Sequence, residues 1–96
     1  MYILVTYDVN TETKAGRRRL RQVAVICKDF GQRVQFSVFE CQVEPARYEE
    51  MKHRLTKTMN PDEDSLRIYR LPGQREQHIE TYGVDRYVSF EEPLIF

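Results

Sequence analysis

A single aspartate ends the first strand-like run of the chain and is the residue best placed for chemistry. The run from Tyr2 to Tyr7 is rich in β-branched and aromatic residues, and it stops at Asp8, which turn-forming residues follow. A carboxylate at the end of a buried strand packs poorly, but it can bind a hard cation such as Mg²⁺. The alternative, that Asp8 only caps a turn or makes a local hydrogen bond, stays open at this point.

A second strand-like segment, residues 31–40, carries polar side chains among apolar ones. Arg33 and Ser37 are both in this segment. Guanidinium and hydroxyl groups can bind phosphate oxygens, so together with Asp8 they suggest a small domain that handles metal and phosphate. Two alternatives remain, because Ser37 can be an ordinary strand serine and Phe39 a core residue.

Four arginines, Arg17, Arg18, Arg19 and Arg21, lie close together near the start of a predicted helix. The chain has 15 basic and 15 acidic residues, but residues 1–35 hold seven basic residues and only three acidic ones. This local positive charge predicts contacts with a nucleic-acid backbone, without readout of the bases. The alternative is a helix surface that is simply solvated.

The periodicity of apolar residues predicts an α+β fold. We expect strands at 2–8 and 65–71, helices over 15–29 and from Pro45 onward, and two short strands within 33–43 that break near 36–38. Residues 76–82 are a candidate edge strand. The order β-α-β-β-α-β is the ferredoxin-like arrangement, in which two helices cover one face of an antiparallel sheet.

A length of 96 residues predicts one domain, residues 1–96, with a small core. The second sheet face has no predicted helix to cover it. We expect Tyr2, Leu4, Phe36 and Phe39 to make that face partly apolar, so that a homodimer packed sheet to sheet would bury it. The tail, residues 83–96, is then expected to pack on the partner, with Leu94–Phe96 as an added edge strand.

The sequence also predicts where the protein works. Cys27 and Cys41 form no CxxC pair and are expected to be reduced core residues. The N-terminal residues show no secretory signal pattern, and no apolar run approaches the length of a membrane span. These features predict a cytoplasmic protein with no membrane partner.

Several segments together resemble a known family. The strand ending in Tyr7-Asp8, the helix with Gly16-Arg17-Arg18-Arg19-Leu20-Arg21 and the block Arg33-Val34-Gln35-Phe36-Ser37-Val38-Phe39-Glu40 resemble the smaller of the two near-universal CRISPR adaptation proteins. The similarity extends over Asp64–Tyr69 and the terminal Pro93–Phe96. The family is associated with metal-dependent endonuclease activity, a ferredoxin-like fold and a homodimer.

The resemblance implies roles for individual residues. Asp8 would be the catalytic, metal-binding carboxylate for Mg²⁺ or Mn²⁺. Tyr7, Arg33, Ser37 and Phe39 match further catalytic positions, and the arginines of the first helix match the basic patch of the family.

The implied function is spacer acquisition with cleavage of DNA or RNA. An alternative is a non-catalytic dimer that binds DNA and bridges copies of the CRISPR integrase. A third possibility is an unrelated ferredoxin-like RNA-binding module or toxin, which would expose aromatic residues on the sheet face for stacking.

Overall fold

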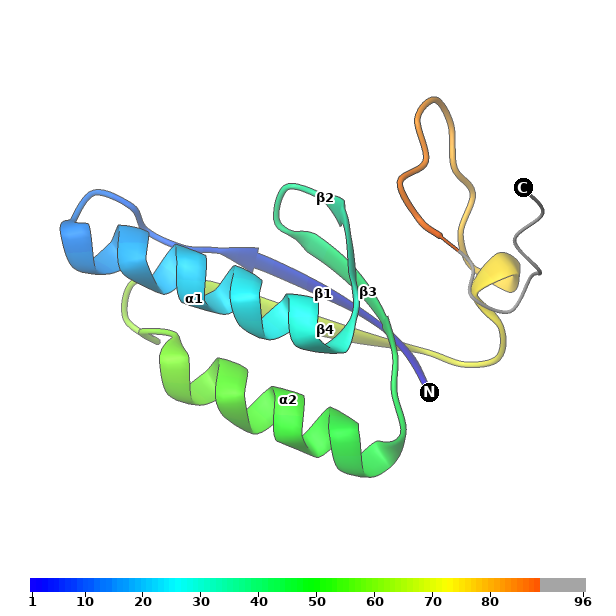
Figure 1. Ribbon diagram of the computed structural model, residues 1–96, viewed down its shortest axis with the longest axis horizontal. Helices are drawn as coiled ribbons and strands as arrows, with labels where there is room; N and C mark the ends of the chain where they lie inside the picture. The colour runs from blue at the N-terminus through cyan, green and yellow to red at the C-terminus, as the bar shows by residue number, and fades with distance from the viewer. Residues whose placement is uncertain (89–96) are drawn as a thin grey trace.

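The computed structural model describes residues 1–88, which form one four-stranded antiparallel sheet and two α-helices (Figure 1). The elements are, in chain order, β1 (Tyr2–Asp8), α1 (Lys14–Phe30), β2 (Gln32–Gln35), β3 (Val38–Gln42), α2 (Pro45–Thr58), β4 (Ser65–Leu71) and a short 3₁₀ helix, η1 (Arg75–Gln77). The order of strands and α-helices is the predicted one, and the ferredoxin-like fold is confirmed.

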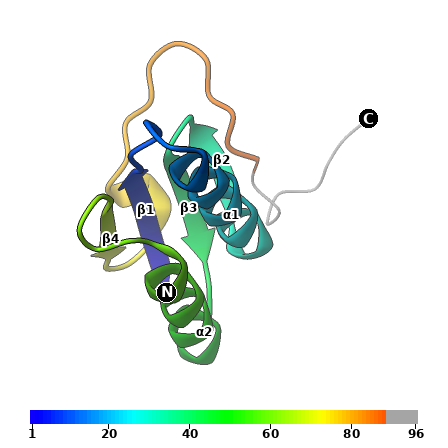
Figure 2. The same ribbon diagram turned by 90° about the vertical axis from the view of Figure 1, so that its left-hand side faces the viewer.

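The sheet has the strand order β2-β3-β1-β4, with β1 antiparallel to both of its neighbours. Figures 1 and 2 show both helices on one side of the sheet. Because side chains alternate along a strand, Ile3, Val5 and Tyr7 of β1 point toward the helices and are buried. They pack in a core with buried residues of α1, β3 and α2, and Leu66 and Ile68 of β4 pack against it. The residues from α1, β3 and α2 are Val23, Ile26, Cys27, Phe30, Phe39, Cys41, Tyr48, Met51 and Leu55.

Local sequence signals explain where the helices begin. The side chain of Thr13 accepts a hydrogen bond from the Gly16 N–H at 3.0 Å, which caps the N-terminus of α1. Pro45 occupies the first position of α2, where its missing N–H costs nothing. Both helices therefore start at residues whose chemistry favours a helix start, α2 at the predicted position and α1 one residue before the predicted 15.

The predicted break near 36–38 is confirmed as a turn at Phe36 and Ser37 between β2 and β3. The side chain of Phe36 at this turn is 91% exposed. The expected position of Phe39 on the uncovered face is wrong. Phe39 pairs with Val5 across the ladder and so shares its side of the sheet, where it is completely buried under the helices.

The sheet face opposite the helices, called the open face below, carries Leu4 and Glu40 and is partly covered by the segment after β4. The candidate edge strand at 76–82 is wrong, since η1 occupies residues 75–77 and no strand follows it within 78–88. Val88 returns to β2, where its carbonyl and N–H bond the Gln32 amide at 2.7 and 2.9 Å. A cavity of about 390 Å³ separates residues 79–86 from the sheet, and Figure 2 shows this stretch as a loop that arches above the sheet and returns toward β2.

The expected packing of tail residues 83–96 on a partner involves residues 89–96, including Leu94–Phe96, which lie outside the described residues. Cys27 and Cys41 are free and buried, as predicted. Burial raises the thiol pKa of each to about 12, which keeps both protonated at neutral pH. Neither α-helix of residues 1–88 is long and apolar enough to cross a membrane.

Candidate active site at the end of the first strand

Asp8 is the last residue of β1 and pairs with Ser65, the first residue of β4. The burial of Ile3, Val5 and Tyr7 against the helices sets the alternation of the strand, so that Asp8 projects on the open face. Its side chain is exposed. An apolar strand thus delivers one carboxylate to the rim of the sheet, where a ligand can reach it.

A hollow of about 560 Å³ adjoins Asp8 and is lined by residues 8–12 and 62–65. Most acidic groups in this lining are exposed, but Asp64 is not. Its carboxylate accepts the backbone N–H of Asn10 at 3.1 Å and of Asn60 at 2.9 Å, and it pairs with Arg19 at 2.8 Å. Burial raises the pKa of Asp64, but the hydrogen bonds from Arg19 and the two N–H groups prevail and hold the pKa below its usual value.

The run Asp62-Glu63-Asp64 has the composition of a solvated turn, but Asp64 is not solvated. Its side chain is 1% exposed and ties the turn before β4 both to α1 and to the loop after Asp8. Because all of its contacts are internal, it is a structural carboxylate and is not free to bind a cation.

The other residues of the predicted catalytic set gather on the helical side of the sheet. The rings of Tyr7 and Phe39 stack with centroids 6.2 Å apart, and the Arg33 guanidinium lies 5.3 Å from the centre of the Phe39 ring. The Tyr7 N–H donates to the Ser37 carbonyl at 3.1 Å, which joins the β2–β3 turn to the end of β1. Burial raises the pKa of the Tyr7 hydroxyl, and the side chains of Arg33 and Ser37 only partly oppose this effect.

The sheet therefore divides the predicted catalytic residues. Tyr7 and Phe39 lie in the core beneath the helices, and Arg33 reaches that side from the edge strand β2, whereas Asp8 lies on the open face. The structure brings Tyr7, Arg33, Ser37 and Phe39 together and leaves Asp8 apart from them. Their contacts can position the end of β1, but the Tyr7 ring does not share a face with the carboxylate of Asp8.

Three of the four predicted nucleic-acid-binding arginines are exposed on α1: Arg17, Arg18 and Arg21. The Arg17 guanidinium donates to the Thr11 carbonyl at 3.2 Å, within the loop that follows Asp8. Arg19 differs, because its side chain is 15% exposed and pairs with Asp64 and Glu63, each at 2.8 Å. The internal ion pairs thus occupy Arg19 and leave the other three arginines accessible.

A buried charged cluster on the open face was not predicted from the sequence. Glu40 of β3 accepts a hydrogen bond from Arg75 at 2.5 Å and another from the Tyr2 hydroxyl. The Arg75 guanidinium also stacks 3.7 Å from the ring centre of Tyr87. One signal was available, since Glu40 stands between the apolar residues Phe39 and Cys41 and a buried carboxylate needs a partner. This cluster attaches η1 to the sheet.

A hard divalent cation fits the chemistry of Asp8, but one chain supplies little of its coordination shell. No group of three or more His, Cys, Asp or Glu within residues 1–88 is arranged to hold a metal. Mg²⁺ commonly binds one or two carboxylates and completes its shell with water and phosphate oxygens. The exposed Asp8 meets this minimal requirement, and a second carboxylate would have to come from another copy of the chain.

Comparison with known proteins places these observations in a family context. Residues 1–79 match the family model described as CRISPR associated protein Cas2. CRISPR-associated endoribonuclease Cas2 1 of Moorella thermoacetica is 57% identical over 95 residues, which are 99% of each chain. CRISPR-associated endonuclease Cas2 of Halalkalibacterium halodurans is 45% identical over 96 residues, which are all of both chains.

Solved structures agree with the fold. The crystal structure of Streptococcus pyogenes Cas2 at pH 6.5 superposes with a TM-score of 0.77 at 57% identity, covering 86% of this chain and all of that one. Another crystal structure of Cas2 has a TM-score of 0.72 at 32% identity, covering 99% of this chain and 98% of that one. Both share the arrangement of helices and strands described above.

Proposed function

The chain belongs to the CRISPR-associated protein Cas2 family, as its sequence predicts, and we propose that it is a metal-dependent endonuclease of CRISPR adaptation that depends on Asp8. The observation that carries this proposal is the exposed Asp8 carboxylate at the open-face end of β1. The names endoribonuclease and endonuclease of its relatives support hydrolysis of phosphodiester bonds.

A homodimer packed through the open face would complete the site. Asp8 projects on that face, and a two-fold axis through it would bring two copies of Asp8 toward one another. Two carboxylates can hold Mg²⁺ or Mn²⁺, whereas one carboxylate holds such an ion weakly. We further propose that residues 1–96 form a single domain whose tail, residues 83–96, packs on the partner, in addition to the contacts of Tyr87 and Val88 with Arg75 and Gln32 of their own chain.

Each group of residues then has a distinct part in the reaction. A bound Mg²⁺ or Mn²⁺ would lower the pKa of a coordinated water and polarise the phosphate. Asp8 holds the ion, while Tyr7, Arg33, Ser37 and Phe39 position the end of β1 through the contacts beneath the sheet. The exposed Arg17, Arg18 and Arg21 bind the nucleic-acid backbone without selecting a sequence. Arg19 supports this surface by linking α1 to Asp64.

The test is cleavage of RNA and DNA probes by an Asp8→Asn variant over a titration of Mg²⁺ and Mn²⁺. Asp62→Asn is the matched control, since it removes an exposed carboxylate from the same hollow. We expect Asp8→Asn to abolish metal-dependent cleavage and to remain dimeric, while Asp62→Asn retains activity. Full activity of Asp8→Asn at every metal concentration would refute the proposed role.

A second function is a non-catalytic scaffold that binds DNA as a dimer and bridges CRISPR integrase subunits. Two observations favour it. Within residues 1–88, Asp8 belongs to no group of three or more side chains that could hold a metal, and the sheet separates Asp8 from Tyr7. If the protein is a scaffold, its Asp8→Asn variant should still support integration in an assay with the integrase. Loss of integration in that variant, with the complex still assembled, would instead favour the nuclease.

A further inference from the structure

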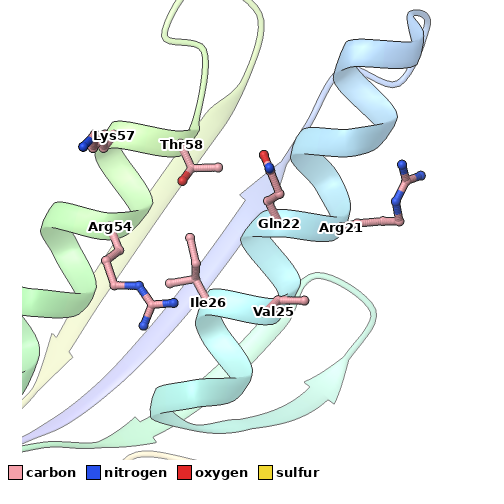
Figure 3. A pocket seen from close by; sticks show the side chains of 7 residues that line it. All are labelled: Arg21, Gln22, Val25, Ile26, Arg54, Lys57 and Thr58. Carbon is pink, nitrogen blue, oxygen red and sulfur yellow. The ribbon is translucent and has the colours of Figure 1, made fainter.

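A groove runs between α1 and α2 on the helical face, on the side away from the sheet (Figure 3). Its volume is about 440 Å³, and it is lined by Arg21, Gln22, Val25, Ile26, Arg54, Lys57 and Thr58. Figure 3 shows Ile26 pointing toward α2 and Arg54 pointing toward α1, with Arg21 on the outer side of α1 and Lys57 on the outer side of α2. The middle of the groove thus lies between the two helices, and a cation stands on each outer side, Arg21 on α1 and Lys57 on α2.

The groove presents apolar surface where a solvated helix would present polar side chains. Val25 of α1 is 58% exposed, and Ile26 beside it is part of the core. Burying an exposed valine on a partner would be favourable, because apolar surface leaves water. An amphipathic helix that docks in a groove lays its apolar face on such a surface.

The charges around the groove all have the same sign. Three cations line it, and within residues 1–88 no acidic residue does. Arg54 is already engaged, since it pairs with Asp29 at 3.0 Å and its guanidinium lies 5.5 Å from the ring centre of Phe30. Arg21 and Lys57 make no ion pair with any of residues 1–88. Two free cations thus flank an apolar centre.

We propose that this groove is a docking site for an acidic amphipathic segment of a partner protein. Its apolar side chains pack on the exposed Val25, beside the buried Ile26, and its carboxylates pair with Lys57 on one rim and Arg21 on the other. At Arg21 the segment competes with the nucleic-acid backbone. This is the helix-in-groove mode of recognition, with specificity set by complementary charge. The groove lies opposite the open face, so a dimer formed through that face displays two copies of it.

Nucleic acid fits the groove less well than an acidic peptide. Affinity for a duplex grows with the number of phosphates that are neutralised, and apolar side chains add little to it. With Arg54 held by Asp29, only two free cations remain, and they stand on opposite sides of an apolar strip. An acidic amphipathic helix uses both features at once.

The experiment measures binding of a fluorescein-labelled helical peptide by anisotropy, using the intact protein. The peptide carries leucines at i, i+3, i+4 and i+7 with glutamates on both flanks, and a second peptide has lysines in place of the glutamates. The protein variants are Val25→Glu and Lys57→Glu, both on exposed helix positions, with Lys14→Glu as a matched charge reversal on α1 outside the groove. A labelled DNA duplex is tested against the same proteins.

We expect the acidic peptide to bind the unmodified protein and the Lys14→Glu control alike. Val25→Glu and Lys57→Glu should each weaken binding about tenfold, and the lysine peptide should not bind. Both variants should retain cleavage that depends on Asp8, so this result is independent of the proposed nuclease activity. Absence of peptide binding, equal binding by all variants, or weakening of duplex binding alone would overturn the proposal.

Discussion

Tyr7 and Asp8 are consecutive in the chain but lie on opposite faces of the sheet. The Tyr7 ring stacks on Phe39 beneath the helices, whereas Asp8 is exposed on the open face opposite Ser65. A strand imposes this division, because successive side chains point in opposite directions. The two residues therefore support the proposed reaction in different ways, one through packing and the other through contact with the cation.

This separation predicts different results for two substitutions of Tyr7. Tyr7→Phe keeps the ring on Phe39 and should retain cleavage, since the hydroxyl does not share a face with Asp8. Tyr7→Ala should destabilise the fold by roughly 3–5 kcal/mol, because it removes a buried aromatic ring. Urea unfolding and cleavage rates measured on the same samples check both outcomes. A folded Tyr7→Phe variant without activity would place the hydroxyl in the reaction.

The arginines of α1 should separate into two classes. Replacing Arg17, Arg18 and Arg21 by glutamine should weaken binding to a DNA duplex and flatten its dependence on salt, because fewer counterions are released. Arg19→Gln should leave the salt dependence nearly unchanged, since Arg19 is paired with Asp64 and Glu63. Anisotropy titrations over a range of salt concentrations measure this slope. An unchanged slope in the triple variant would make those three arginines a solvated surface.

Asp64 should make the stability of the protein depend on pH. Its folded-state pKa is lowered by Arg19 and two backbone N–H groups against the opposing effect of burial, so the ionised form is favoured in the fold. This stabilisation is fully present above the unfolded pKa, about 3.9, and is lost as the pH falls through the lower folded pKa. Asp64→Asn should therefore be less stable than the unmodified chain at neutral pH, and the difference should shrink in acid.

Thermal unfolding between neutral pH and pH 3, about one unit below the usual aspartate value, measures this effect. Asp62→Asn is the control, since the Asp62 side chain makes no ion pair within residues 1–88. If the difference in unfolding temperature between Asp64→Asn and the unmodified chain stays constant with pH, the charge of the carboxylate does not contribute to stability.

Helices and strands were predicted well where the spacing of apolar residues agrees with the residues that favour turns and helix starts. The run of β-branched and aromatic residues identified β1, Pro45 marked the start of α2, and the change of apolar phase located the turn at Phe36 and Ser37. It failed after β4. Residues 75–77 form a 3₁₀ helix, and its Arg75 pairs with Glu40, a contact between residues 35 positions apart that no local pattern reveals.

The candidate site was predicted only in part for a similar reason. Asp8 could be identified as a strand-end carboxylate, but the face on which each neighbour lies depends on strand register. Phe39 was placed on the wrong face because the turn at Phe36 resets the alternation between β2 and β3. The ion pair of Arg19 could not be predicted either, since its partner Asp64 is 45 residues away in the chain.

The protein should be a dimer in solution, and removing Leu94–Phe96 should weaken it. Asp8 lies on the open face, and residues 1–88 of one chain provide only part of a cation site, so the proposed activity requires a second copy. Burying three apolar side chains on a partner is worth roughly 1.5–3 kcal/mol each as an upper value, so their loss should shift the dimer equilibrium measurably. Sedimentation equilibrium of the full and truncated chains tests this, with a Glu91→Gln, Glu92→Gln variant as a tail control that keeps the apolar residues. A stable monomer of the full chain at micromolar concentration would contradict the prediction, and it would also weaken the case for a shared metal, because a single Asp8 holds Mg²⁺ poorly.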